Sequence, residues 1–237
     1  MADNFFSGYT NLIGKQYYQK RVMPYSISGV NMDLLRELFP GIPECRDDWL
    51  PDWSSFDYPW EILVEGGNGI LRQISKLLDG SEVFIHESAK IGDYVRIEGP
   101  SIIGPNAEIR HGAYLRRGSW ICEGALVGHS SEVKNSILLP RAKAPHFNYV
   151  GDSILGIDSN IGAGAKLSNV RNDRRSILVT VEDGMRIDSG SKKLGALVGD
   201  GSQLGCNVVT NPGTLIYPNS MIGPNQTISG WFSTMSE

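Results

Sequence analysis

The sequence lacks the features that mark several classes of protein. It has no run approaching the roughly 20 apolar residues of a membrane span, and its polar start lacks the charged-then-apolar order of a secretory leader. Its net charge is -4, so it has no basic excess for nucleic acid or an anionic membrane surface. Its three cysteines form no CxxC pair, which argues against a disulfide framework or a zinc cluster. We therefore expect a cytoplasmic protein that binds a small molecule.

Glycine, by contrast, is abundant, with 28 residues that favour many tight corners. Aliphatic residues also recur at every sixth position, ten in succession: Ile85, Ile91, Ile97, Ile103, Ile109, Leu115, Ile121, Val127, Val133 and Leu139. A period of six fits neither an amphipathic helix nor a hairpin meander, but it is typical of a solenoid whose short strands turn a corner every six residues. The pattern predicts a mainly β protein in which three hexapeptides make one coil.

The period fails twice, between Pro140 and Ser153 and between Leu167 and Val198. We therefore predict a hexapeptide-repeat β-helix over residues 85–237, with a loop at 140–154 and a projecting β-hairpin inserted at 168–197. Segments that leave a solenoid are tolerated only on its outside, so both breaks are candidate sites. Residues 166–193 carry seven basic and four acidic side chains, which suits a phosphate group. The alternative for this segment is a solvated hairpin with scattered charges.

Residues 1–84 lack the period and form a separate helical and aromatic arm. Capping signals predict one short helix that starts at Asn31 and ends before Pro40, and a second from Asn68 to Leu78. The aromatic residues are concentrated in one stretch: Trp49, Trp53, Phe56, Tyr58 and Trp60. We expect them to pack the arm on the first coils or on a neighbouring subunit. We interpret the arm as a cap over the exposed end of the solenoid, with a ligand-binding aromatic box as the alternative.

The first break reads Arg141-Ala-Lys-Ala-Pro-His-Phe-Asn-Tyr-Val-Gly-Asp152 and is followed by Asn160-Ile-Gly-Ala-Gly164. Together with Leu115-Arg-Arg-Gly and Glu132-Val-Lys-Asn, it resembles the acetyltransferase half of the bifunctional N-acetylglucosamine-1-phosphate uridyltransferase/glucosamine-1-phosphate acetyltransferase enzymes. The segment from Arg141 to Asp152 resembles the archaeal-type sugar-1-phosphate nucleotidylyltransferase/acetyltransferases of that family more closely still. The resemblance implies a left-handed parallel β-helix, a homotrimer, and sites shared by neighbouring subunits. No nucleotide-binding Gly-rich loop precedes the coil, so we expect no uridyltransferase activity from this chain.

The resemblance also implies roles for individual residues. His146 matches the general base that takes a proton from the sugar amine as the amine attacks the thioester of acetyl-CoA. Arg116 and Lys134 match the ligands of the sugar phosphate. They lie one coil apart, so their charges would repel each other unless an anion lay between them. The alternatives are a structural role for His146 and ordinary surface charge for Arg116 and Lys134.

The remaining matches concern the amino sugar and coenzyme A. Tyr149, Asn160 and Asn169 match residues that hold the amino sugar. The backbone amide of Ala163 matches a donor to the acetyl carbonyl oxygen, where it would stabilise an oxyanion. Asn160 and Ala163 would also suit an ordinary corner of the coil. The predicted coenzyme A ligands on the hairpin are Arg175, Ser191, Lys192 and Lys193.

The sequence therefore predicts an acetyl-CoA-dependent N-acetyltransferase for glucosamine-1-phosphate or galactosamine-1-phosphate, feeding UDP-N-acetyl-sugar and cell-envelope synthesis. The γ-type carbonic anhydrases share the coil, but they need two histidines five residues apart. The four histidines, His86, His111, His129 and His146, never show that spacing, so no metal site is expected. A non-catalytic trimeric scaffold, or a regulatory partner of a separate sugar nucleotidyltransferase, is the alternative from a different class.

Overall fold

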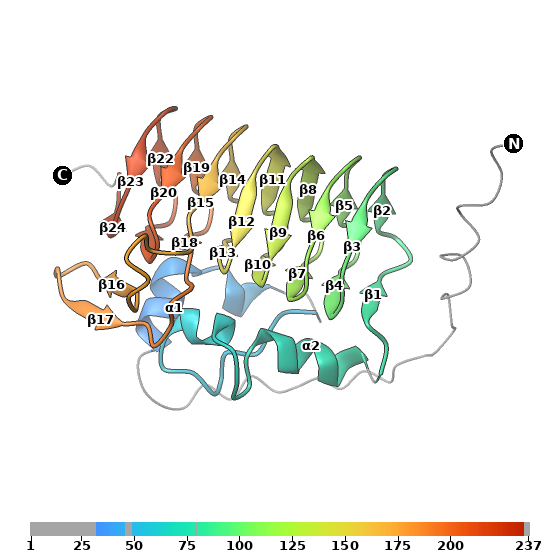
Figure 1. Cartoon of the computed structure of the whole chain (residues 1–237), viewed down its shortest axis with the longest axis horizontal. Helices are drawn as coiled ribbons and strands as arrows, with labels where there is room; N and C mark the ends of the chain where they lie inside the picture. Colours follow the sequence, from blue (N-terminus) through green and yellow to red (C-terminus); the bar gives the residue numbers. More distant parts are fainter. Residues whose placement is uncertain (1–31, 46–48, 79, 235–237) are drawn as a thin grey trace, which may run out of the picture.

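A computed structural model describes residues 32–45, 49–78 and 80–234. Most of this chain winds into a parallel β-helix with short strands (Figure 1). The strands form three parallel sheets of eight, seven and seven strands, which we name sheets A, B and C. Each turn adds one strand to each sheet, so the coil is a three-sided prism. The predicted fold class is confirmed, and the coil is consistent with the left-handed β-helix that the resemblance implies.

The strands of sheet A are β1 (Val83–Ile85), β4 (Ser101–Ile103), β7 (Ser119–Ile121), β10 (Ser136–Leu138), β13 (Ile154–Leu155), β18 (Ala196–Val198), β21 (Thr214–Ile216) and β24 (Trp231–Phe232). Those of sheet B are β2 (Lys90–Ile91), β5 (Glu108–Ile109), β8 (Leu126–His129), β11 (Lys143–His146), β14 (Asn160–Ile161), β19 (Gln203–Leu204) and β22 (Met221–Ile222). Those of sheet C are β3 (Arg96–Ile97), β6 (Tyr114–Leu115), β9 (Glu132–Lys134), β12 (Tyr149–Gly151), β15 (Lys166–Leu167), β20 (Val209–Thr210) and β23 (Thr227–Ile228).

The interior of the prism is filled by the aliphatic residues of the repeat. Ile103, Ile109 and Leu115 occupy the inward positions of successive strands and are fully buried. Small residues such as Ala107 and Ala113 fill the space near the corners. Because strands of all three sheets place aliphatic residues inward, stacked turns bury a continuous core.

Residues 140–154 do not leave the coil, so the loop predicted there is wrong. Strands β11 and β12 pair in parallel with the turns before and after them, and Ala144 and Val150 are buried in the interior. The six-residue count fails because two corners are each one residue shorter: Leu138 follows Val133 by five residues, and Leu155 follows Val150 by five. Leu138 therefore takes the inward position predicted for Leu139, whose side chain packs on the outside of sheet A.

The second break contains an antiparallel hairpin between β15 and β18. Its strands are β16 (Leu178–Thr180) and β17 (Arg186–Asp188), with Val179 opposite Ile187. The hairpin packs on the coil and does not project into solvent, which corrects the prediction of a projecting hairpin. Ile177 and Val179 are buried in the same apolar cluster as Leu215 of sheet A. The hairpin thus adds to the layer that covers sheet A.

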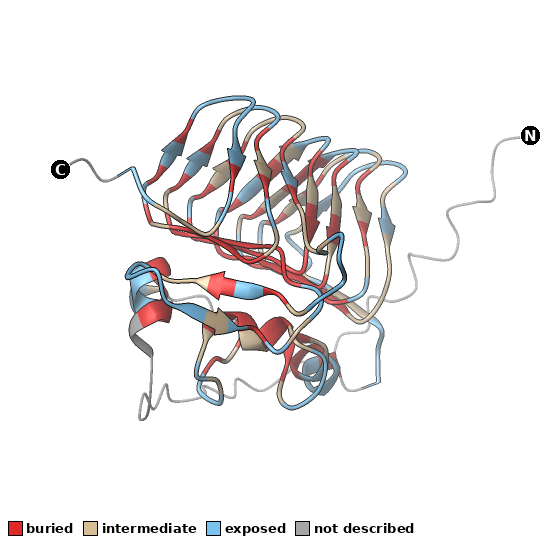
Figure 2. Ribbon diagram, turned by 60° about the vertical axis from the view of Figure 1, so that its left-hand side comes forward, coloured by how far each residue is buried: buried red, intermediate tan, exposed pale blue. Residues whose placement is uncertain are grey.

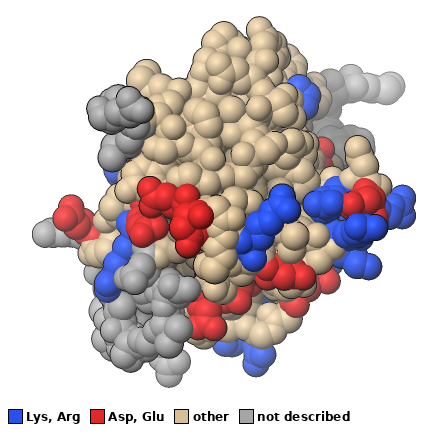
Figure 3. Space-filling view, turned by 90° about the vertical axis from the view of Figure 1, so that its left-hand side faces the viewer, with Lys and Arg blue, Asp and Glu red and all other residues tan. Residues whose placement is uncertain are grey.

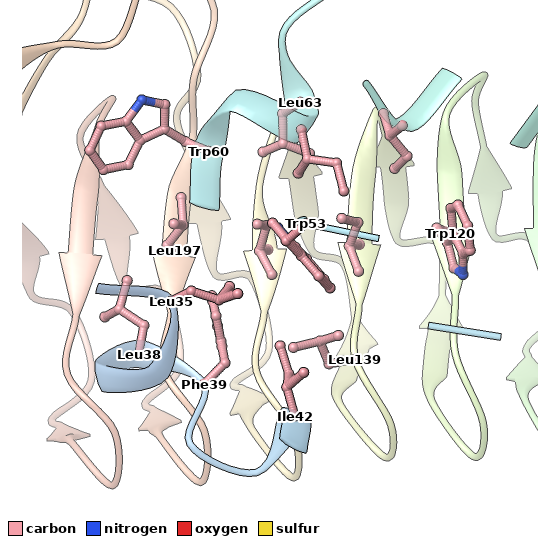
Figure 4. Close-up of a cluster of buried hydrophobic side chains, with 14 of the residues drawn as sticks. Leu35, Leu38, Phe39, Ile42, Trp53, Trp60, Leu63, Trp120, Leu139 and Leu197 are labelled. Carbon is pink, nitrogen blue, oxygen red and sulfur yellow. The ribbon is translucent and has the colours of Figure 1, made fainter. Parts of the chain in front are cut away.

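The arm provides the rest of that layer (Figures 1 and 2). Its helices are α1 (Met32–Leu38), the 3₁₀ helices η1 (Ile42–Glu44) and η2 (Pro59–Leu63), and α2 (Ile70–Leu78), so both predicted helices are present. Apolar side chains of the arm, such as Trp53 and Trp60, pack on outward-facing residues of sheet A, such as Trp120 and Leu197 (Figure 4). The arm covers a side of the prism and not its end, which corrects our interpretation of it as an end cap.

Two contacts fix the arm along this side. The indole Nε1 of Trp120 donates to the Trp49 carbonyl at 2.7 Å, and the Trp49 ring stacks on Phe84 with 4.5 Å between centroids. Within the described ranges, no helix has the length and apolar character needed to cross a membrane.

Candidate functional site

The outer surface of sheet C and the corner after it bring together four predicted substrate ligands. Arg116 follows β6, Lys134 ends β9 and Tyr149 begins β12 on successive turns, while Asn169 lies in the corner after β15. Lys134 lies opposite Gly151 in the pairing of β9 with β12. The stacking of the turns therefore places these side chains side by side, although up to 53 residues separate them in sequence.

Both cations of this group already have a carboxylate partner. Arg116 Nη1 lies 3.0 Å from Glu132 Oε1, and Lys134 Nζ lies 3.2 Å from Asp152 Oδ2. The hydrogen bond to Glu132 raises the pKa of the Arg116 guanidinium, which therefore stays charged. The repulsion that we expected between Arg116 and Lys134 is offset by these carboxylates, which the sequence reasoning missed. The sequence does not reveal these ion pairs, because they depend on which residues of successive turns lie side by side.

Tyr149 and Asn169 are joined by a hydrogen bond. Asn169 Nδ2 donates to the Tyr149 hydroxyl at 3.2 Å and also to Asp152 Oδ2. Burial raises the pKa of Tyr149, and the nearby charge of Asp152 adds to this effect, so the phenol stays protonated at neutral pH. Gly151 makes room for this contact: a methyl group at Gly151 would lie 2.6 Å from the Tyr149 hydroxyl.

His146, the predicted base, lies at the adjacent corner, between sheets B and C. Its backbone N–H donates to Asn148 Oδ1 at 2.9 Å, and its carbonyl accepts from the Gly164 N–H at 2.9 Å. Asn148 is buried and donates to the Gly162 carbonyl at 2.7 Å, so the corner is held on several sides. The imidazole itself is exposed, and within the described part of the chain it makes no hydrogen bond.

Strand β11 reaches His146 over a close backbone contact. A methyl group at Gly128 of β8 would lie 1.6 Å from the Pro145 carbonyl oxygen, so only glycine fits beneath this part of β11. Beside His146, exposed rings contact one another along the same corner. Phe147 contacts His129 with 5.1 Å between centroids, and His129 lies 5.5 Å from His111. The described residues contain no group of three or more potential metal ligands.

The other predicted residues fall into separate places within one chain. Ala163 lies at the corner of His146, next to Gly164. Asn160 begins β14 of sheet B and lies opposite Lys143, so it is on a different face from Tyr149. One chain therefore does not unite Asn160 with the other substrate ligands.

The predicted coenzyme A ligands lie at the base of the hairpin, on the side of sheet A. Ser191 Oγ accepts from the Lys193 N–H at 3.0 Å, and the Arg175 N–H donates to Asp173 Oδ1 at 3.2 Å. The side chains of Lys192 and Lys193 are exposed. Figure 3 shows charged side chains gathered in the lower half of this view, around the hairpin and the arm. Within one chain, Ala163 and the hairpin residues lie at different corners of the prism.

The family model of the GMPPB C-terminal domain matches residues 97–210. A bifunctional sugar-1-phosphate nucleotidylyltransferase/acetyltransferase of Sulfurisphaera tokodaii is 40% identical over 195 residues, which are 75% of this chain and 46% of the relative. A bifunctional protein GlmU of Methanococcus maripaludis is 36% identical over 73% of this chain and 44% of the relative.

The chain thus spans less than half the length of these two relatives. An uncharacterized acetyltransferase of Escherichia coli, YaiX, is 32% identical over 64% of this chain and 76% of the relative. The chain belongs to the hexapeptide-repeat acetyltransferase family that includes the acetyltransferase domains of the bifunctional sugar-1-phosphate enzymes.

Proposed function

We propose that this protein is an acetyl-CoA-dependent N-acetyltransferase of an amino-sugar 1-phosphate, either glucosamine-1-phosphate or galactosamine-1-phosphate. The observation that carries the proposal is the grouping of Arg116, Lys134, Tyr149 and Asn169 on one face, next to the corner of His146. A guanidinium and an ammonium one coil apart suit a phosphate dianion. A phenol and an amide beside them suit the hydroxyl groups of a sugar.

In the proposed reaction, the nitrogen of the sugar amine attacks the thioester carbonyl carbon of acetyl-CoA. His146 takes the proton that the amine loses, a new C–N bond forms, and the C–S bond breaks. The same proton then passes from the imidazole to the departing sulfur. The backbone N–H of Ala163 would face the carbonyl oxygen as negative charge develops there.

We also propose that the working form is a homotrimer. His146 and Ala163 lie at the corner between sheets B and C, whereas the candidate coenzyme A ligands Arg175, Ser191, Lys192 and Lys193 lie on the side of sheet A. A neighbouring copy that faced this corner would supply the groups that one chain keeps apart, including Asn160. The proposal places the protein in the cytoplasm, where it would feed UDP-N-acetyl-sugar and cell-envelope synthesis.

The test is release of free thiol from acetyl-CoA with glucosamine-1-phosphate or galactosamine-1-phosphate as acceptor. We expect turnover by the wild type and a loss of about 10²–10⁴-fold in His146→Ala, the range typical of a missing general base. His86→Ala is the matched control, because His86 lies in the first turn, where its ring forms a hydrogen bond with Ser88 and an edge contact with Phe84. Full activity of His146→Ala would exclude His146 as the base, and a monomer mass by light scattering would exclude the shared site.

The alternative is a non-catalytic trimeric scaffold that partners a separate sugar nucleotidyltransferase. The observation in its favour is the exposed His146 ring, which within the described residues has no acceptor to orient it. Absence of thiol release with every amino-sugar phosphate, together with a trimer mass and binding of a nucleotidyltransferase, would favour this function over catalysis.

A further inference from the structure

Three polar side chains form a ladder at one corner of the coil, and the proposed function uses only one of them. Asn135, Asp152 and Asn169 follow sheet C on three successive turns and are spaced 17 residues apart. Asn135 Nδ2 donates to Asp152 Oδ1 at 2.8 Å, and Asn169 Nδ2 donates to Asp152 Oδ2. The carboxylate of Asp152 therefore lies between two amides, one from the turn below and one from the turn above.

The two shortened corners produce this ladder. Asn135 lies in the five-residue step from Val133 to Leu138, and Asp152 lies in the step from Val150 to Leu155. Both residues have left-handed backbone conformations, with φ of 45° and 47°, which Asn and Asp adopt more readily than most residues.

Their side chains are turned into the protein. Asn135 is 7% exposed and Asp152 is 3% exposed. Arg117, in the six-residue corner of the turn before them, is exposed. The shift of register therefore places a buried carboxylate behind the candidate substrate face.

A buried carboxylate needs donors, and Asp152 has three. Besides the two amides, Lys134 Nζ lies 3.2 Å from Oδ2 and 3.5 Å from Oδ1. If Lys134 turned to another anion, the two amides would still donate to Asp152. The Asp152 carboxylate can thus hold the Lys134 ammonium at the surface of sheet C, while its own position is fixed by the two amides.

The ladder also reaches the arm. Asn135 Nδ2 donates to the carbonyl of Leu63, the last residue of η2, at 2.8 Å. The same amide group therefore contacts the arm on one side and Asp152 on the other. The arm, which covers sheet A, holds the lower end of the ladder.

We propose that Asp152 is a positioning residue of the substrate site. It holds the ammonium of Lys134 and the amide of Asn169 in the orientation in which they meet the phosphate and the amino sugar, and Asn135 braces it against the arm. This role rests on the proposed function, because Lys134 and Asn169 are ligands in that proposal. A role as a structural staple of the corner would affect stability alone.

The experiment compares Asp152→Asn with Asp158→Asn in the full chain. Asp158 is the matched control because it also has a left-handed backbone, with φ of 56°, and also pairs with a cation, Arg141, but at an exposed corner away from the ladder. The readouts are the Kd of glucosamine-1-phosphate by calorimetry, kcat and KM for both substrates, and the melting temperature.

We expect Asp152→Asn to raise the Kd and KM for glucosamine-1-phosphate about tenfold or more, with KM for acetyl-CoA unchanged. The new side-chain amide of residue 152 places its NH₂ group against the NH₂ group of Asn135 or Asn169, and it leaves Lys134 without a counter-charge. In a Lys134→Met background, the same substitution should change the Kd about threefold or less, because its partner is already absent.

The outcomes separate this role from the proposed reaction. Tight binding without turnover, with the expected loss in Asp152→Asn, would support the positioning role and overturn the acetyl transfer. An unchanged Kd in Asp152→Asn with a lowered melting temperature would overturn the positioning role and show that Asp152 only stabilises the corner. Equal losses with and without Lys134 would show that Asp152 does not act through Lys134. A wild type that does not bind the sugar phosphate would overturn both proposals.

Discussion

The carboxylate of Asp200 clips the arm to the coil, and its ionisation should make that attachment depend on pH. Asp200 Oδ2 accepts from the Gly41 N–H at 2.8 Å, and Oδ1 accepts from the Ile157 N–H at 2.7 Å. Burial raises the pKa of Asp200 from 3.8 to about 6, although both hydrogen bonds act in the opposite direction. Since the folded pKa lies above the unfolded value, the folded protein binds this proton more tightly than the unfolded chain does.

This increase in the pKa of Asp200 corresponds to roughly 3 kcal/mol in the free energy of unfolding. This contribution is fully present below about pH 4 and is lost as the pH rises through about 6. The assay is urea unfolding of the wild type and of Asp200→Asn, which does not titrate, from pH 4 to pH 8. The stability of the wild type relative to the variant should rise by roughly 3 kcal/mol toward the acid end.

Carboxylates that do not interact with Asp200 contribute equally to both proteins and cancel in this difference, whereas the charge of Asp158 is one of the causes that raise the pKa of Asp200. Asp158→Asn is the contrasting variant: the hydrogen bonds from Arg141 lower the pKa of Asp158 from 3.8, so its contribution is lost only below about pH 4, and the difference between the wild type and this variant should stay nearly constant from pH 4 to pH 8. A difference between the wild type and Asp200→Asn that stays constant from pH 4 to pH 8 would refute the reasoning.

Three further substitutions test close contacts. Gly151→Ala should raise KM for the sugar phosphate about tenfold with the fold intact, because the new methyl displaces the Tyr149 hydroxyl; steady-state kinetics and melting temperature measure this. Gly128→Ala should lower the free energy of unfolding by about 3 kcal/mol or more, because its methyl meets the Pro145 carbonyl. Denaturant unfolding measures the loss. Trp60→Ala should cost about 3–5 kcal/mol in the same assay, because the ring is fully buried between arm and coil.

Controls exist for each of these changes. Gly223→Ala adds a methyl group near only the flexible side chain of Gln226, at 3.2 Å, so we expect little effect. Leu77 is 41% exposed, and Leu77→Ala should cost less than about 1 kcal/mol. An unchanged KM in Gly151→Ala would remove Tyr149 from the substrate site. A fully stable Gly128→Ala would contradict the close approach of the two strands, and a fully stable Trp60→Ala would contradict the packing of the arm.

The period of six was enough to predict the coil, because each inward aliphatic obeys it independently of distant residues. It could not distinguish a loop from a corner shortened by one residue, because both shift the count. The period therefore predicts a departure from the coil between Pro140 and Ser153, although Ala144 and Val150 keep the inward positions.

The sequence also contains a pattern that indicates the layer covering sheet A, although the period of six does not include it. Strands of this sheet carry two adjacent apolar residues, as in Trp120-Ile121, Ile137-Leu138 and Leu215-Ile216. One of each pair faces the interior and the other faces the arm or the hairpin, which is typical of a parallel sheet buried on both faces.

The candidate site was predictable only in part. The motifs pointed to the cations on sheet C, and their spacing of 18 residues correctly stacked Arg116 on Lys134. The partners Glu132 and Asp152 could not be assigned from those motifs, because they depend on the local register. Once the register is known, the spacing of 17 residues identifies the ladder through Asp152.

The layer over sheet A also bears on where this chain can be divided. A cut at residue 84 follows the change in sequence character, yet it would strip Trp53 and Trp60 from the outward faces of Trp120 and Leu197. A fragment starting at residue 85 would carry an uncovered apolar wall along most of its length. Such a surface drives self-association, so the coil and the arm are best expressed, stored and studied as one piece.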